Sequence, residues 1–222
     1  MGISRQDLFL QSKGFERTTF AKKKIILVGC GGIGSVLAEL LVRGGFSDLI
    51  LLDGDVVDES NLQRQIFCSQ SVGKNKALAL LKRLLCINNK LKVEAVPRFL
   101  SAENLAEVCT DAALIVDASD NFETRRLIDD YCKRENIPWL YNGAEAGQCC
   151  SCLFQGESSA FSRIFSQVGE SKGCSQNGVL ASTTFAAASL AYQEILKFFL
   201  GVSKNELVKL DLWEGKIEKV RF

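Results

Sequence analysis

Three glycines and one acid in the first quarter of the chain have the types and spacing of a nucleotide site. Gly29, Gly31 and Gly34 fit the pattern G-x-G-x-x-G and directly follow the apolar run Ile25–Val28. In such a turn the first glycine permits a tight bend, the second lets a phosphate approach the backbone, and the third lets a helix pack closely on the strand. Asp53 ends the next apolar run, at the distance expected of a carboxylate that binds a ribose hydroxyl. These residues predict a bound nucleotide whose phosphates face the start of the following helix.

Further charged residues follow the ends of other predicted strands. Arg64 and Lys76 come after the second strand, and Asp120 and Asn121 come after the fourth. Open α/β sheets bind ligands beyond the carboxyl ends of their strands, so these side chains should surround one nucleotide. Arginine and lysine bind phosphate oxygens, and a carboxylate can hold magnesium. The set is larger than NAD requires and favours a triphosphate.

The composition excludes several classes of protein. The chain has 222 residues, of which 47% are hydrophobic, and its net charge is +1. That charge argues against a nucleic-acid or membrane-surface role, and no apolar run reaches the roughly 20 residues that span a bilayer. Because the first residues do not read as a signal peptide, we expect a cytoplasmic protein whose nine cysteines are mostly reduced.

Alternating apolar strands and amphipathic helices predict an α/β, Rossmann-like fold. We expect a mostly parallel sheet with helices on both faces, and antiparallel strands added in the C-terminal part. The expected single domain spans residues 1–222, with an N-terminal helical arm at 1–20 and a mobile crossover loop at 156–177. The expected strands are 25–28, 49–52, 93–96, 112–117, 137–141 and 148–154, the expected helices are 4–12, about 32–45, 74–85, 101–109, 121–135 and 178–200, and a closing hairpin spans 207–222.

Several motifs together resemble the ThiF/MoeB family, relatives of ubiquitin-activating enzymes. The resemblance covers nearly the whole chain, and the Asn-Leu-x-Arg-Gln motif at this distance from the glycines is far more specific than the glycines alone. Members of this family adenylate the C-terminal glycine of a small ubiquitin-like sulfur carrier that ends in Gly-Gly. The matching motifs are Ser4-Arg5-Gln6, Gly29-x-Gly-Gly-x-Gly34, Asp53-x-Asp55, Asn61-Leu-x-Arg64-Gln65, Lys76 and Asp117-x-x-Asp120-Asn121.

The resemblance implies a role for each matched residue. Gly32 approaches the phosphates, Asp53 binds the ribose, and Asp120 engages magnesium. Asn61, Arg64 and Lys76 contact the triphosphate, and Arg5 reaches the ATP of the other subunit in a homodimer. The residues expected at the nucleotide are Gly29, Gly31, Gly32, Gly34, Asp53, Asp55, Asn61, Arg64, Lys76, Asp120 and Asn121, and the expected catalytic residues are Arg5, Arg64, Lys76, Asp120 and Cys174.

The chain has no histidine, which removes histidine-based acid–base catalysis and histidine metal ligands. Adenylation of a carboxylate is compatible with this absence. The nucleophile is already ionised at neutral pH and needs no general base. Positioning and cationic stabilisation of the transition state are then the main catalytic tools.

Two groups of cysteines match positions that matter in the family. Cys149-x-x-Cys152 resembles the first half of a structural zinc site, but no second C-x-x-C follows. Zinc then lacks two of its four ligands unless Cys150 or Cys174 substitutes, and we expect reduced thiols instead. Cys174 precedes the buried helix and matches a cysteine that can bond to the activated carrier. Lys172 and the helix start favour its thiolate, although a loop cysteine without a role is the alternative.

The leading function is therefore an ATP- and magnesium-dependent carrier adenylyltransferase, most like the thiamine branch of the family. The molybdopterin branch is an alternative, and Cys174 favours the thiamine branch over it. The glycine turn and Asp53 alone would also permit an NAD-dependent oxidoreductase. A non-catalytic half of a heterodimer and enzymes that adenylate a tRNA-bound acid or a peptide stay open. The expected partners are the carrier, a second copy of the chain and a sulfur donor such as a cysteine desulfurase.

Overall fold

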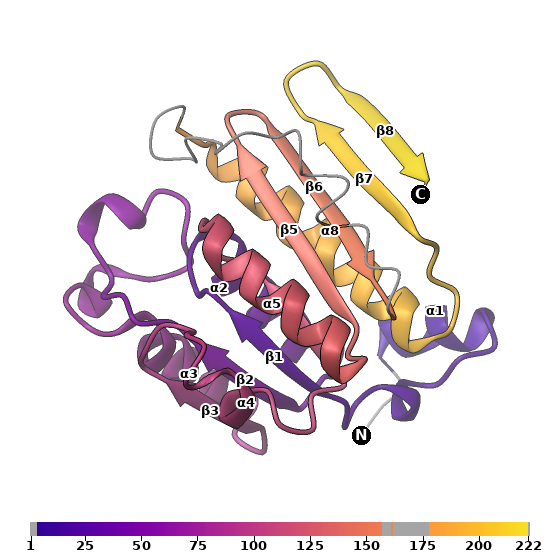
Figure 1. Ribbon diagram of the computed structural model, residues 1–222, viewed down its shortest axis with the longest axis horizontal. Coiled ribbons are helices and arrows are strands. Elements are labelled where there is room, and N and C mark those ends of the chain that lie inside the picture. The colour runs from indigo at the N-terminus through magenta and orange to yellow at the C-terminus, as the bar shows by residue number, and fades with distance from the viewer. Residues whose placement is uncertain (1–3, 157–160, 162–177, 222) are drawn as a thin grey trace.

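The structure is a computed structural model that describes residues 4–156, 161 and 178–221. An eight-stranded sheet in the order β3-β2-β1-β4-β5-β6-β7-β8 runs through it (Figure 1). Strands β1 to β5 are parallel, and β6 to β8 are antiparallel to their neighbours. The strands are β1 (Lys24–Val28), β2 (Asp48–Leu52), β3 (Lys92–Val96), β4 (Leu114–Asp117), β5 (Trp139–Glu145), β6 (Gln148–Phe154), β7 (Glu206–Asp211) and β8 (Lys216–Arg221).

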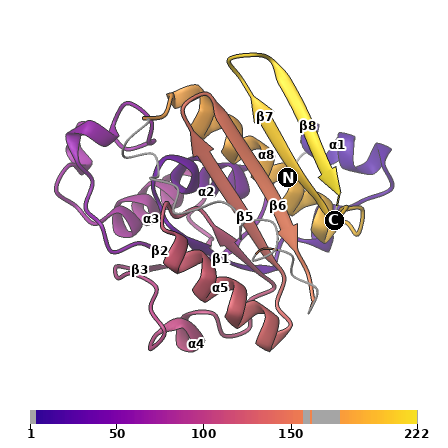
Figure 2. The same cartoon turned by 45° about the horizontal axis from the view of Figure 1, so that its top comes forward.

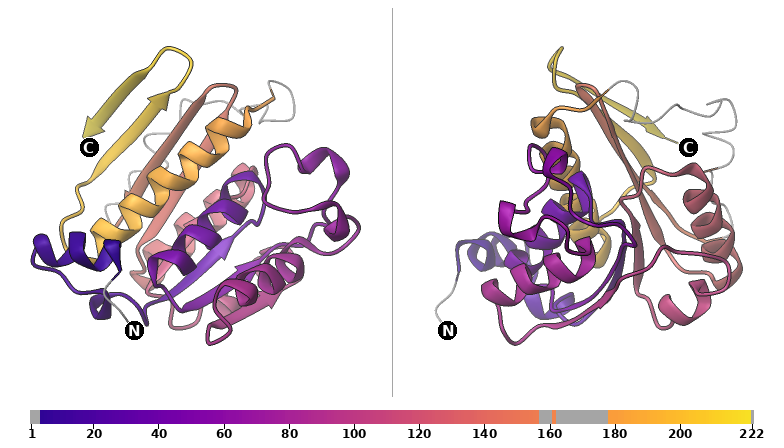
Figure 3. Two further views of the ribbon diagram at one scale, coloured as in Figure 1. Left: turned by 180° about the vertical axis from the view of Figure 1, so that it is seen from behind. Right: turned by 90° about the vertical axis from the view of Figure 1, so that its left-hand side faces the viewer.

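Helices cover both faces of this sheet, which confirms the predicted fold class. Helices α2, α3 and α8 lie on one face, and α4 and α5 lie on the other (Figure 3). The helices are α1 (Arg5–Ser12), α2 (Gly32–Gly44), α3 (Lys76–Ile87), α4 (Leu105–Val108), α5 (Phe122–Glu135) and α8 (Ala181–Phe199), with 3-10 turns η1 (Arg17–Thr19), η2 (Glu59–Asn61) and η3 (Ser69–Ser71). Within the described residues, none of these helices has the length and apolar character needed to cross a bilayer.

The central strands are apolar on both faces because each face is covered. In β1, Ile25 and Leu27 contribute to the core beneath α2 and α8, whereas Ile26 and Val28 contribute to the core beneath α5. Successive side chains of a strand point to opposite faces, so a strand buried on both sides reads as a continuous apolar run. This explains why β1, β2 and β4 were predictable from the sequence.

The C-terminal strands extend the sheet beyond the reach of α5. Helix α5 packs on β4 and β5, and Figure 2 shows the β7–β8 hairpin at the far edge of the sheet. On the α5 side, the ends of β5 to β8 that face the nucleotide turn carry polar residues such as Glu145, Gln148 and Lys209. The sheet therefore presents a polar surface next to the predicted nucleotide site.

Several predicted elements have somewhat different bounds in the structure, and two differences are the most informative. Strand β5 continues to Glu145 because Asn142 to Glu145 pair with Gln148 to Ser151 in a hairpin, although these residues are polar or small. The helix predicted over 101–109 is shorter, since α4 covers only Leu105–Val108. Of the predicted crossover loop, residues 157–160 and 162–177 lie outside the described part of the chain.

Candidate active site

The glycine turn between β1 and α2 brings strand and helix into close contact. Gly29 has a φ of +93°, and a Cβ atom there would lie 2.7 Å from the Ala118 carbonyl oxygen. A Cβ atom on Gly34 would lie 1.9 Å from the Gly29 carbonyl oxygen, a distance that only glycine can accommodate. Helix α2 begins at Gly32, so its first backbone N–H groups lie at this turn.

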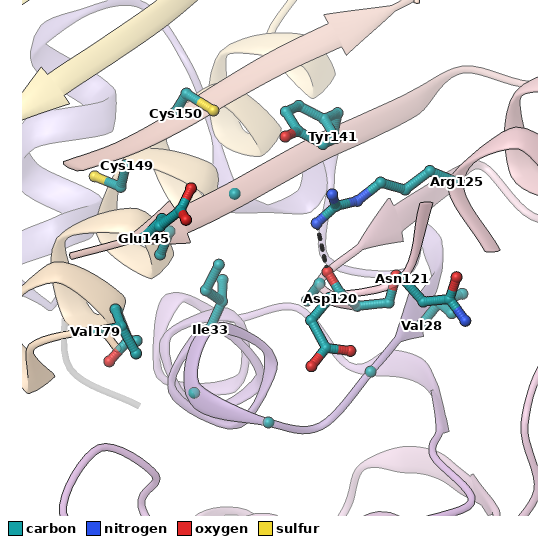
Figure 4. A pocket seen from close by; sticks show the side chains of 18 of the residues that line it. Val28, Ile33, Asp120, Asn121, Arg125, Tyr141, Glu145, Cys149, Cys150 and Val179 are labelled. Atoms are coloured by element: carbon teal, nitrogen blue, oxygen red, sulfur yellow. Dashed lines mark hydrogen bonds between the residues drawn. The ribbon is translucent and has the colours of Figure 1, made fainter. Parts of the chain in front are cut away.

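A pocket of about 650 Å³ opens at the carboxyl ends of the parallel strands. Its lining combines the glycine turn with polar residues from several distant segments of the chain (Figure 4). The pocket brings together most of the residues predicted at the nucleotide: Gly29, Gly31, Gly32, Asp53, Asp55, Arg64, Lys76, Asp120 and Asn121.

Asp53 is fixed beside the glycine turn by two backbone donors. Its Oδ2 accepts the Cys30 N–H at 2.7 Å, and its Oδ1 accepts the Asp55 N–H at 2.8 Å. Burial raises the pKa of this carboxyl group, and the two backbone hydrogen bonds and nearby Lys76 oppose that rise. The carboxylate is therefore held in one orientation at the rim of the pocket, next to the residue between the first two glycines of the motif.

Lys76 is the cation that the start of α3 contributes to the pocket. Its side chain is buried, and Nζ lies 2.9 Å from Asp55 Oδ2. The Asn75 side chain caps the helix by accepting the Leu78 N–H, and its Nδ2 donates to the Asp53 carbonyl oxygen. The cap thus joins the start of α3 to the end of β2 and fixes where Lys76 enters the site.

Arg64 and Gln65 lie on a segment that the start of α8 holds in place. Thr184 Oγ1 donates to the Arg64 carbonyl oxygen at 3.3 Å, and the Arg64 side chain donates to the Ser60 carbonyl oxygen at 3.1 Å. Gln65 is buried and lines the pocket, and its Oε1 has no hydrogen-bond partner among the described residues. Gln65 is part of the Asn-Leu-x-Arg-Gln motif, but no role was predicted for it from the sequence.

The polar residues at the end of β4 and in the turn after it have different contacts. Asn121 caps α5, because its side chain accepts the Glu123 N–H at 2.8 Å, and Asp120 is left facing the pocket. Asp117 is fully buried and accepts the Ser119 N–H, the Ser119 hydroxyl and Arg125 Nε–H.

Sequence reasoning missed two parts of this pocket. One is Arg125. Its helix carries many charged residues, and the sequence alone does not show that Arg125 lies on the buried side. The other is the surface formed by the ends of β5 to β8, including Tyr141, Cys150 and Lys209. These strands carry no nucleotide-binding motif, and the hairpin pairing brings their ends to the pocket.

Some predicted site residues are not among those that line the pocket. Asn61 lies in η2, where its side chain accepts the Asp58 N–H at 3.2 Å. Arg5 is exposed at the start of α1, which Gln6 ties to the body by donating to the Gly44 carbonyl oxygen. Gly34 lies behind the turn, and Cys174 lies outside the described residues.

The structure does not bring Cys149 and Cys152 together. Both lie in β6, three residues apart, and therefore point to opposite faces of the sheet. Cys149 belongs to the core beneath α2 and α8, whereas Cys152 belongs to the core beneath α5. Within the described ranges no three Cys, Asp or Glu side chains form a group able to hold a metal ion. Strand geometry thus separates the two thiols of the C-x-x-C motif.

Comparison with known proteins gives consistent matches. The model of the ThiF family matches residues 4–222. A sulfur carrier protein ThiS adenylyltransferase from Bacillus subtilis is 31% identical, over 98% of this chain and 67% of its own. A molybdopterin-synthase adenylyltransferase from Haemophilus influenzae is 29% identical, over 97% of this chain and 91% of its own. The crystal structure of Escherichia coli MccB with ATP shares the fold at a TM-score of 0.79 and 22% identity, over 92% of this chain and 65% of that chain.

Proposed function

Because the family match spans residues 4–222, this chain belongs to the ThiF family, and we propose that it adenylates the C-terminal glycine of a ubiquitin-like sulfur carrier. The observation that carries the proposal is the single pocket in which the glycine turn meets Arg64, Lys76 and Asp120. One relative named as a sulfur carrier protein ThiS adenylyltransferase and another named as a molybdopterin-synthase adenylyltransferase support it. An NAD-dependent oxidoreductase would have no use for these two cations.

ATP suits the residues on the nucleotide side of the pocket. Asp53 accepts the ribose hydroxyls, and the start of α2 at Gly31 and Gly32 faces the phosphates. Arg64 and Lys76 contact the phosphate oxygens, and Lys76 exchanges the Asp55 carboxylate for a phosphate when ATP binds.

Magnesium fits the donors that the described chain provides. This ion is usually held by one or two carboxylates together with substrate phosphates rather than by an all-protein cage. Asp120 supplies one such carboxylate at the pocket wall, next to the glycine turn. Bound there with ATP, magnesium would neutralise phosphate charge.

The reaction joins two anions, so the protein must reduce their repulsion and align them. The carrier carboxylate attacks the α-phosphorus, and the pyrophosphate leaves with the electrons of the broken bond. Arg64 and Lys76 stabilise the charge that moves onto the pyrophosphate, and Gly31 leaves the backbone open to the phosphates. No proton is taken from the nucleophile, which agrees with the absence of histidine.

Two further features belong to the proposal. Arg5 is exposed on α1 and does not line the pocket of its own chain, so it serves the site of a second copy in a homodimer. The Cys174 thiolate attacks the carbonyl carbon of the acyl-adenylate, a thioester to the carrier forms, and AMP leaves with the electrons of the broken acyl–oxygen bond. The match of Cys174 to a cysteine of the ThiF branch is the reason to propose the ThiS carrier of thiamine synthesis ahead of the molybdopterin carrier.

Intact-mass measurement of the carrier tests the proposal. ThiS from Bacillus subtilis, incubated with this protein, ATP and magnesium, should gain the mass of one adenylyl group. A carrier that lacks its terminal glycine should gain none, and NAD should not replace ATP. Failure of ThiS and of the molybdopterin carrier to gain mass would contradict carrier adenylation.

A further inference from the structure

Arg125 is a buried arginine whose guanidinium group reaches the pocket wall. It projects from the first turn of α5 and is only 6% exposed, yet it lines the pocket. Its guanidinium carbon lies 4.9 Å from the centre of the Phe122 ring and 4.9 Å from that of the Tyr141 ring. Figure 4 shows the group pointing into the pocket, with Tyr141 on one side and Asp120 on the other. Two rings therefore fix its plane.

The hydrogen bonds of this group leave donors unused. Nε donates to Asp117 Oδ2 at 3.0 Å, and Nη2 donates to the Ser119 carbonyl oxygen at 2.7 Å. A guanidinium has five N–H donors, and Nη1 has no partner among the described residues. Among the described residues, Gln65 Oε1 is the one side-chain polar atom that is both sealed from solvent and without a hydrogen-bond partner. Because Arg125 Nη1 has no partner either and is not such an atom, it is not sealed from solvent. It is therefore open to the pocket that Arg125 lines.

The other cations around the pocket lie elsewhere. Arg64 and Lys76 lie on the nucleotide side, close to the glycine turn or to Asp55. On the strand side, Lys209 and Lys216 lie directly opposite acidic residues of the neighbouring strand, Glu218 and Asp211 respectively. Among the described residues, Arg125 is thus the cation placed between the nucleotide and the ends of β5 and β6.

We propose that Arg125 binds the carboxylate that is to be adenylated, an assignment that rests on the proposed function. A carboxylate accepts charge-assisted hydrogen bonds from a guanidinium, and the unpaired Nη1 offers such donors next to Asp120. One carboxylate oxygen then forms the bond to the α-phosphorus, and the bond from that phosphorus to the bridging oxygen breaks. The electron pair leaves with pyrophosphate, and no proton moves.

The rigid setting of Arg125 suits this role. Asp117, Ser119 and two aromatic rings hold the guanidinium before any substrate arrives, so no side-chain ordering is needed when the carboxylate binds. Preorganised donors of this kind stabilise an anion more effectively than mobile ones. A residue that only held the Asp120 turn in place would instead change how magnesium and ATP bind.

Substrate kinetics of Arg125→Lys separate these roles. Lysine keeps a positive charge beside Asp117 but loses the fork of the guanidinium, and Arg126→Lys, on the exposed side of the same helix, is the matched control. In ATP–pyrophosphate exchange we expect the KM for ThiS to rise about tenfold or more, as for loss of a charge-assisted hydrogen bond. The KM for ATP should stay within about twofold, because the cations on the nucleotide side are intact.

A ThiS with a C-terminal carboxamide gives a readout that a structural role would not change. Calorimetry with a non-hydrolysable ATP analogue should show wild-type protein preferring the carboxylate form, and Arg125→Lys should lose that preference. Equal preference in both proteins, or a rise in the KM for ATP as large as that for ThiS, overturns the assignment alone. If the wild type shows exchange neither with ThiS nor with the molybdopterin carrier, the proposed function fails, and the assignment fails with it.

Discussion

The Lys76 ammonium and the Asp55 carboxylate form an ion pair of 2.9 Å within the candidate active site. Lys74, two residues earlier, has the same charge but is exposed, and its Nζ donates to the Gln70 carbonyl oxygen outside the pocket. Of two lysines that the sequence placed at the start of the same helix, the fold therefore buries one beside the glycine turn and leaves the other in solvent.

Replacement of Lys76 by methionine should lower the exchange rate by about 10²–10³-fold, as for loss of one preorganised transition-state donor. Methionine has a similar length and keeps the apolar contacts of the lysine stem. Lys74→Met should exchange at nearly the wild-type rate. Steady-state pyrophosphate exchange measures both, and equal losses in the two variants would show that Lys76 has no special contact with the triphosphate.

Two glycines of the same turn should respond differently to alanine. Gly34→Ala would place a methyl group against the Gly29 carbonyl oxygen, so the free energy of unfolding should fall by about 3 kcal/mol or more. At Gly31 the nearest atom to an added Cβ is Gln65 Nε2 at 3.7 Å, so Gly31→Ala should fold. Its methyl group would project towards the pocket and weaken ATP binding. Denaturant unfolding and calorimetry with ATP check the pair, and normal ATP affinity in Gly31→Ala would argue against phosphates at this turn.

Among the described cysteines, Cys68 should react first with iodoacetamide. It is exposed, and the Ser71 hydroxyl, with its oxygen 3.6 Å from the sulfur, lowers the pKa of this thiol. A lower pKa gives more thiolate at neutral pH, and labelling should accelerate as the pH rises towards that pKa. Burial raises the pKa of Cys109 to about 12 and that of Cys149 to about 11, so both should react slowly.

Peptide mapping after brief labelling at neutral pH gives the order of reaction. Ser71→Ala is the informative variant, because it leaves Cys68 exposed but removes the hydroxyl, and labelling should slow. Unchanged labelling of Cys68 in this variant would show that exposure alone sets its reactivity.

Mixed dimers test whether Arg5 acts on the site of the other subunit. Arg5→Ala and Arg64→Ala should each be nearly inactive alone. In a mixed dimer, one site carries both substitutions and the other site is intact. Random mixing makes about half of the dimers mixed, so about a quarter of the wild-type activity should return. No recovery on mixing, with subunit exchange verified by mass, would contradict a role for Arg5 in trans.

The parts of the site that depend on neighbouring residues in the sequence could be predicted without the structure. The run from β1 through Gly34, and Asp53 at the end of β2, follow from strand periodicity and glycine sterics. Asp120 was also predicted to face the pocket. Such features depend on a few neighbouring residues, so their physical cause is visible in the sequence.

The remaining features depend on contacts between distant segments. Arg125 faces the pocket because α5 packs on β4 and β5, and the helix sequence alone does not fix that orientation. Cys149 and Cys152 looked like half of a metal site, but pairing of β6 with β5 and β7 turns them to opposite faces. Spacing on its own cannot distinguish a loop from a strand, and that difference decides whether two thiols can meet.

Carrier-dependent ATP–pyrophosphate exchange in the wild type and in Arg64→Ala tests the central claim most directly. The wild type should exchange only when ThiS, ATP and magnesium are all present. Arg64→Ala should keep the wild-type melting temperature, because Arg64 is only half-buried. It should lose exchange by about 10²–10³-fold, because Arg64 lines the pocket beside Gly32. Exchange by Arg64→Ala at the wild-type rate would contradict the adenylation mechanism.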